Sequence, residues 1–76
     1  MNPSYLEMFE QKSTISAKLD ELMTAEVSDA ILLSARLNNV WKQYNLGLCE
    51  ASECIRTLNQ IDNAITEMQQ NGKRTV

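Results

Sequence analysis

The chain has 76 residues, enough for one small domain, and folding at this size buries only roughly 60% of the surface that the unfolded chain exposes. It contains no histidine and two cysteines, and its formal charge is −3, with basic residues scattered among acidic ones. Nucleic acid is therefore not expected as a ligand, because affinity for it depends on neutralising phosphates. Small domains usually need disulfides, a metal or a partner chain, and this composition favours a partner chain.

The usual catalytic sets cannot be assembled from this sequence. Histidine and a glycine-rich phosphate loop are missing, and no serine or cysteine lies beside a plausible base. Glu50 and Glu53 lie one helical turn apart and fit a solvated acidic face better than a carboxylate pair. Trp41 and Tyr44 fit packing better than a ligand box. We therefore expect no enzymatic activity, no cofactor, no metal and no small-molecule ligand.

No stretch of the sequence approaches the roughly 20 apolar residues that span a bilayer. Residues 1–10 also lack a basic region followed by an apolar run. We expect no membrane insertion and no ordinary cleavable signal. A protein exported by another route would have the same features.

The first predicted element is a helix over residues 3–25. Asn2 followed by Pro3 is the order expected of an N-cap and a first turn. Apolar residues then recur at steps of three and four, with most charged residues off that stripe. The stripe consists of Tyr5, Met8, Phe9, Ile15, Leu19, Leu22 and Met23.

A turn over residues 26–29 interrupts this pattern. Ser28 followed by Asp29 fits an N-cap with an acidic residue in the first turn of the next helix. A turn of this length between two amphipathic helices predicts an antiparallel hairpin. The side chains expected to pack the hairpin together are Leu19, Leu22, Leu33, Leu37, Val40 and Tyr44.

The second helix is predicted over residues 30–70, with a polar tail over 71–76 in which Asn71-Gly72 supplies the C-cap. At 1.5 Å per residue it is about 60 Å long, so roughly half of its apolar stripe has no partner inside the chain. Covering that half could contribute on the order of 5–10 kcal/mol before entropy costs. The predicted protein interface is Leu48, Ala51, Ile55, Leu58, Ile61, Ile65 and Met68. Alternatively, the helix breaks near residues 45–47, where Gly47 would ease a break, and folds back as a third helix.

The two cysteines, Cys49 and Cys54, are five positions apart within this predicted helix. On a helix they would lie about 140° apart around the axis and could not bridge without unwinding. We therefore expect free thiols that pack as small apolar side chains.

The order and spacing of several short elements resemble the needle subunits of type III secretion systems. The match covers about residues 17–68, and the ordered set carries it, since no single element is specific. The elements are Leu19-Asp20-Glu21-Leu22, Ser28-Asp29 with Leu32-Leu33, Tyr44-Asn45-Leu46 and Ile61-Asp62-Asn63-Ala64-Ile65, with Ser52, Ile55, Arg56 and Leu58 before the last of them.

The resemblance implies a structural subunit that polymerises with copies of itself into the secretion needle, secreted to the bacterial cell surface. Hairpins that stack head to tail through a non-closing contact form such filaments. The alternative is a small helical co-chaperone of the same apparatus, which would be cytoplasmic and would keep the needle subunit soluble together with a larger chaperone. The polar tail and the two cysteines favour this alternative slightly. A general helical adaptor or inhibitor is a third interpretation.

Overall fold

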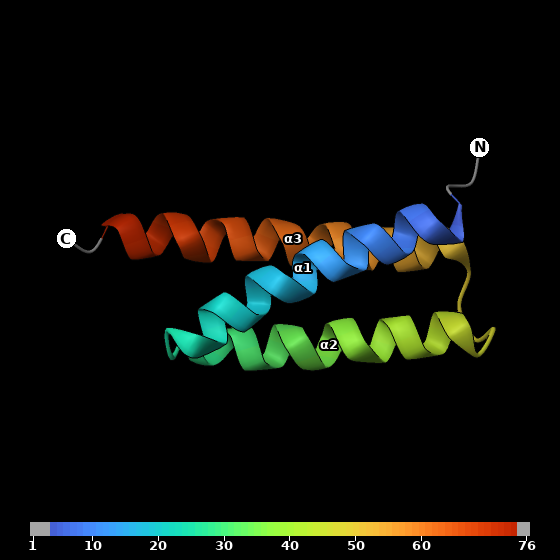
Figure 1. Ribbon diagram of the computed structural model, residues 1–76, viewed down its shortest axis with the longest axis horizontal. Coiled ribbons are helices and arrows are strands. Elements are labelled where there is room, and N and C mark those ends of the chain that lie inside the picture. Colours follow the sequence, from blue (N-terminus) through green and yellow to red (C-terminus); the bar gives the residue numbers. More distant parts are fainter. Residues whose placement is uncertain (1–3, 75–76) are drawn as a thin grey trace.

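The computed structural model describes the backbone of residues 4–74 and the side chains of residues 4–70. This part of the chain forms three helices joined by two short connections (Figure 1). The helices are α1 (Tyr5–Thr24), α2 (Ser28–Asn45) and α3 (Ala51–Arg74). The prediction of an all-α fold is confirmed over these residues, which contain no strand. None of the three helices is apolar over a long enough stretch to cross a membrane.

The first helix is capped by a serine. The Ser4 hydroxyl accepts a hydrogen bond from the backbone N–H of Glu7 at 3.2 Å, and the Glu7 carboxylate lies in the first turn, where the helix dipole favours it. The predicted cap by Asn2 and Pro3 lies outside the described residues. The helix therefore begins two residues later than predicted, at Tyr5.

The first connection, residues 25–27, ends α1 with a Schellman motif. The N–H of Glu26 donates to the carbonyl of Met23 at 3.0 Å, and the N–H of Val27 donates to the carbonyl of Leu22 at 3.0 Å. These two bonds satisfy carbonyls that the end of a helix leaves free. Glu26 takes the left-handed conformation that the motif requires, with φ 63°.

The second helix begins one residue earlier than the predicted cap implies. Ser28 is already helical, and Val27 is the N-cap residue, with extended backbone and no side-chain hydrogen bond. The prediction of Ser28 as the N-cap is therefore wrong, because the Schellman motif fixes the backbone up to Val27. Asp29 does lie in the first turn of α2, as expected.

The second connection, residues 46–50, ends α2 with the same motif. The N–H of Gly47 donates to the carbonyl of Tyr44 at 3.1 Å, and the N–H of Leu48 donates to the carbonyl of Gln43 at 2.8 Å. Gly47 has φ 76°, a conformation that glycine adopts without steric cost. The continuous helix expected over residues 30–70 is therefore two helices, and the alternative of a third helix is what the structure shows.

The third helix runs antiparallel to α2, and α1 lies obliquely across both (Figure 1). Every pair of helices is in contact. α3 continues through Arg74, so the predicted C-cap at Asn71-Gly72 is wrong. Its C-terminal end projects beyond the first connection (Figure 1). The fully buried core residues are Met8, Ile15, Leu19, Ala30, Leu37, Cys54, Leu58, Ile61 and Ile65.

The apolar stripe of α3 is therefore packed inside the chain. Leu58, Ile61 and Ile65 are each 0% exposed, in the same cluster as residues of α1 and α2. The expectation that this stripe lacks an intrachain partner is wrong. The physical reason is the second connection, which turns α3 back so that its own chain covers it.

Candidate interaction surface

The residues predicted for a protein interface have different environments in the fold. Leu58, Ile61 and Ile65 are buried, and Leu48 is exposed. The other three members, Ala51, Ile55 and Met68, are half-buried. Five of its seven members thus lie in the core or pack against it, and only Leu48 is freely accessible.

The residues predicted to pack the hairpin lie at or beside the core. Leu19 of α1 and Leu37 of α2 are buried. The remaining members are half-buried and packed against the core cluster: Leu22, Leu33, Val40 and Tyr44.

All four aromatic residues of the chain gather between α1 and α2. The Trp41 ring lies at the centre, with its centroid 5.5 Å from that of Tyr5, 6.1 Å from that of Phe9 and 5.9 Å from that of Tyr44. The Tyr5 and Tyr44 rings are stacked with centroids 6.2 Å apart. Aromatic pairs at these separations stabilise by about 0.5–1.5 kcal/mol beyond the area they bury.

Sequence reasoning placed Tyr5 and Phe9 on the packed stripe of the first helix but did not pair them with Trp41 and Tyr44. A usable signal was present. Tyr5 and Tyr44, and likewise Phe9 and Trp41, are nearly equidistant from residue 25, where the chain turns. Residues equidistant from the turn of an antiparallel hairpin lie opposite each other, so the two pairs had to meet.

Hydrogen bonds fix the Tyr5 ring of this cluster. The Tyr5 hydroxyl donates to Asn45 Oδ1 at 2.8 Å, and Asn45 Nδ2 donates to the carbonyl of Trp41 at 2.7 Å. The amide of Asn45 therefore links the start of α1 to the last turn of α2. The aromatic cluster is held in one arrangement from both helices.

The exposed apolar side chains at this end of the bundle form what we call the apolar end surface. It consists of Tyr5, Leu6 and Phe9 at the start of α1, and Leu46 and Leu48 in the second connection. The start of α1 and the second connection lie at the same end of the molecule (Figure 1), as the Tyr5–Asn45 hydrogen bond requires. Large apolar side chains gathered on a surface mark sites of protein association more often than isolated ones do.

A second, smaller group of exposed apolar residues lies near the opposite end of the bundle. It comprises Met23 in the last turn of α1 and Ile31 and Leu32 in the first turns of α2. It contains no aromatic ring. The two groups differ in chemistry, and they provide a matched pair for experiments.

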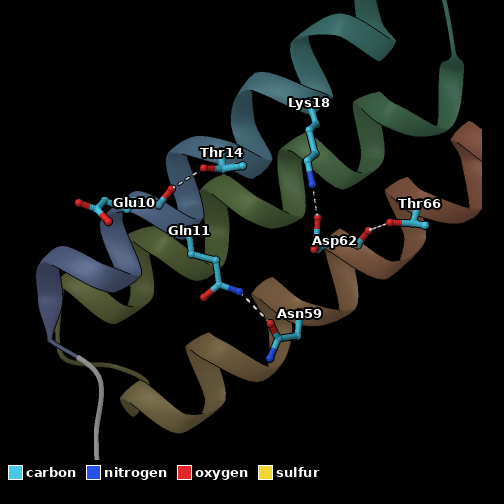
Figure 2. Close-up of polar contacts among 7 residues, drawn as sticks. All are labelled: Glu10, Gln11, Thr14, Lys18, Asn59, Asp62 and Thr66. Carbon is cyan, nitrogen blue, oxygen red and sulfur yellow. Dashed lines mark hydrogen bonds and ion pairs between the residues drawn. The ribbon is translucent and has the colours of Figure 1, made fainter.

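Polar side chains join α3 to α1. Lys18 Nζ of α1 lies 3.0 Å from Asp62 Oδ1 of α3, and Gln11 Nε2 donates to Asn59 Oδ1 at 2.8 Å (Figure 2). Both side chains of the ion pair are more than one-third exposed, so it contributes at most about 1 kcal/mol. These contacts set the register of α3 more than they stabilise it.

A shallow cavity of about 210 Å³ lies between α2 and α3 and contains a thiol on its wall. Its lining includes Arg36, Val40, Cys49 and Glu53. Both cysteines are free thiols, as expected; Cys49 is half-buried, and Cys54 is fully buried behind it in the core cluster. Burial, and secondarily the neighbouring Cys49, raises the pKa of the Cys54 thiol. Among the described residues, no three cysteine, aspartate or glutamate side chains are grouped as metal ligands would be.

Comparisons of this chain with protein-family models, with curated proteins and with solved structures find no match.

Proposed function

We propose that this protein is a non-enzymatic helical co-chaperone of a type III secretion apparatus, which binds another helical protein through the apolar end surface. The observation that carries the proposal is that exposed aromatic and aliphatic side chains lie on a bundle whose core is already closed. Such a bundle is complete as a monomer and still offers apolar surface to a partner.

The closed core favours the co-chaperone over a polymerising subunit. Polymerisation was expected because the stripe from Leu48 to Met68 needed another chain to cover it. With Leu58, Ile61 and Ile65 fully buried, that requirement is gone. Association must use other residues, and the largest exposed apolar side chains are at the two ends of the bundle.

The end that carries the aromatic rings is the better binding surface of the two. Tyrosine, tryptophan and phenylalanine are enriched at protein interfaces because they bury large areas at a small entropic cost. The rings of Tyr5 and Phe9 are partly exposed and already held by Trp41 and Asn45. A partner therefore pays little to order them.

The partner that suits this surface is a helix with an apolar stripe. The needle subunit and the larger chaperone of the same apparatus are the proteins that the sequence resemblance implies. In the complex, the apolar end surface would cover a stripe that is exposed before assembly.

Co-expression with the needle subunit and the larger chaperone of one secretion apparatus tests the proposal. We expect a soluble complex that survives size-exclusion chromatography. Leu6→Ser should weaken binding by about tenfold or more, since Leu6 is 64% exposed and is not one of the core residues.

Ile31→Ser is the matched control, because Ile31 is 63% exposed at the other end of the bundle. It should leave binding within about twofold. Equal loss in both variants, or no complex with the unmodified protein, would contradict the proposal.

A needle subunit is the second candidate, favoured by the ordered elements shared with that family. It requires an antiparallel hairpin with a longer C-terminal helix, which this chain would form only if α2 and α3 joined through residues 46–50. Electron microscopy of the concentrated protein separates the candidates. Long filaments would support the needle subunit, and a monomer at every concentration would support the co-chaperone.

A further inference from the structure

The two cysteines occupy paired positions at the start of α3. α3 begins at Ala51, and the N–H of Cys54 donates to the carbonyl of Glu50 at 3.0 Å, which makes Glu50 the N-cap residue. Cys49 is then the residue before the N-cap, and Cys54 is the fourth residue of the helix. Side chains at these two positions pack against each other in the hydrophobic staple found at many helix starts.

The burial of the two thiols agrees with this pairing. Cys54 is fully buried, and Cys49 is half-buried and packs against the core cluster that contains Cys54. Burial, and secondarily the neighbouring Cys49, raises the pKa of the Cys54 thiol.

The two cysteines do not share one helix in the folded chain. We expected that they could not bridge without unwinding because one helix through both residues would place the thiols about 140° apart. Cys49 lies instead in the second connection, outside any helix. Closing a bridge to Cys54 therefore does not require unwinding a helix that contains both residues.

We propose that Cys49 and Cys54 form a dithiol site that exchanges with a low-molecular-weight disulfide and closes an intramolecular disulfide across the start of α3. The Cys49 thiolate attacks one sulfur of the small disulfide, and the other half leaves as a thiolate that takes up a proton. The Cys54 thiol then loses its proton and attacks the Cys49 sulfur, which releases the second half as a thiol. Overall, the two protein thiols are oxidised to one disulfide and the small disulfide is reduced to two thiols.

Access decides which cysteine reacts first. Cys49 is on the wall of the cavity between α2 and α3, which gives a small disulfide a route to its sulfur. Cys54 is enclosed in the core, so a small disulfide does not reach its sulfur directly. Cys54 reacts only with the Cys49 sulfur, after that sulfur has formed the mixed disulfide. The site thus contains an attacking thiol and a resolving thiol, as reversible redox sites do.

The disulfide would fix the start of α3. It constrains the second connection against the first turn of α3 and closes a short loop. In a continuous α2–α3 helix the same two residues could not be bonded, because they would lie on different faces. Oxidation therefore excludes a continuous helix through residues 49–54.

Incubation of the native protein with oxidised glutathione, followed by mass spectrometry, tests the site. We expect loss of both free thiols with a mass lower by two hydrogens, in a monomer whose peptide map joins residues 49 and 54. Cys54→Ala should stop at a stable glutathione adduct on Cys49. Cys49→Ser should slow the first reaction by about tenfold or more, because the remaining thiol is buried.

The same incubation in denaturant is the control for folding, and it does not depend on any variant. The measured quantity is the ratio of intramolecular disulfide to mixed disulfides. This ratio should be at least several-fold higher in the native protein than in the unfolded chain. Persistent adducts on the native wild-type protein, disulfide-linked dimers at low protein concentration, or equal ratios in both conditions would overturn the proposal.

Discussion

The two connections end their helices with the same hydrogen-bonded motif but stabilise it in different ways. Each places one residue in the left-handed conformation, Glu26 in the first connection and Gly47 in the second. A side chain in that conformation costs roughly 1–2 kcal/mol, and glycine avoids this cost. The first connection therefore needs a compensation that the second does not.

The compensation in the first connection is an apolar contact. Schellman motifs are often accompanied by packing between the residues that flank the turn, which here are Leu22 and Val27. Both are half-buried and packed against the core. The corresponding residues of the second connection, Gln43 and Leu48, are both exposed. One turn is thus held by packing and the other by glycine, so glycine alone is an incomplete guide to where helices end.

The largest expected effect on stability comes from truncating a buried side chain of α3, the helix that the second connection turns back onto α1 and α2. Leu58→Ala should destabilise the protein by about 2–5 kcal/mol, because it leaves a cavity in a fully packed core. Urea unfolding followed by circular dichroism measures the change. For a chain this small, such a loss can unfold a large fraction of the molecules.

Leu48→Ala is the control for this substitution, because Leu48 was assigned to the same predicted interface and is 71% exposed. It should change the free energy of unfolding by no more than about 0.5 kcal/mol. Similar small effects of both substitutions would mean that α3 does not pack on α1 and α2.

Most of the fold was predictable from periodicity, but the second connection was predicted only as the alternative to a continuous helix. The turn near residue 26 was found because the apolar pattern stops there. Across residues 46–50 the pattern continues, since Tyr44, Leu48, Ala51 and Ile55 keep helical spacing through a segment that is not helical. Gly47 was the only local sign of a break, and one glycine is also tolerated inside a helix.

The candidate sites were predictable only where they depended on the first turn. The aromatic cluster follows from a hairpin that turns at residue 25, so its pairs could have been read from the sequence. The pairing of Cys49 with Cys54 depends on where α3 begins. It could not be predicted while residues 30–70 were taken as one helix.

Smaller effects are expected from substituting the residue with the left-handed backbone in each connection. Gly47→Ala should destabilise by about 1 kcal/mol, because a Cβ at φ 76° is strained although it meets no atom within 4 Å. Glu26→Gly should stabilise by about 0.5 kcal/mol, as relief of strain exceeds the added flexibility of the unfolded chain. Thermal unfolding of both variants measures the two changes.

The opposite signs of these two effects are the critical result. If Gly47→Ala were neutral, Gly47 would not be the residue that ends α2. If Glu26→Gly were destabilising, the Glu26 side chain would contribute a contact that outweighs its backbone strain.

The smallest expected effect is a dependence on pH that arises in the first turns of α3, directly after the second connection. Folding raises the pKa of the Cys54 thiol above its ordinary value of 9.0, so the unfolded chain loses this proton at lower pH than the folded one. The stability linked to this thiol is complete below pH 9.0 and falls as the pH rises through the folded pKa. In the reduced protein, the free energy of unfolding should therefore decrease more steeply above pH 9 than in Cys54→Ala.

The other titratable groups are common to both proteins and cancel in the comparison. Glu26→Gln supplies the control from the first connection. It should follow the slope of the unmodified protein above pH 9, because it leaves Cys54 and its burial unchanged. Parallel curves of unfolding free energy against pH for the unmodified protein and Cys54→Ala would contradict this expectation. They would show that the Cys54 thiol is as accessible to water in the folded chain as in the unfolded one. Cys54 would then lack the burial that makes it the resolving thiol.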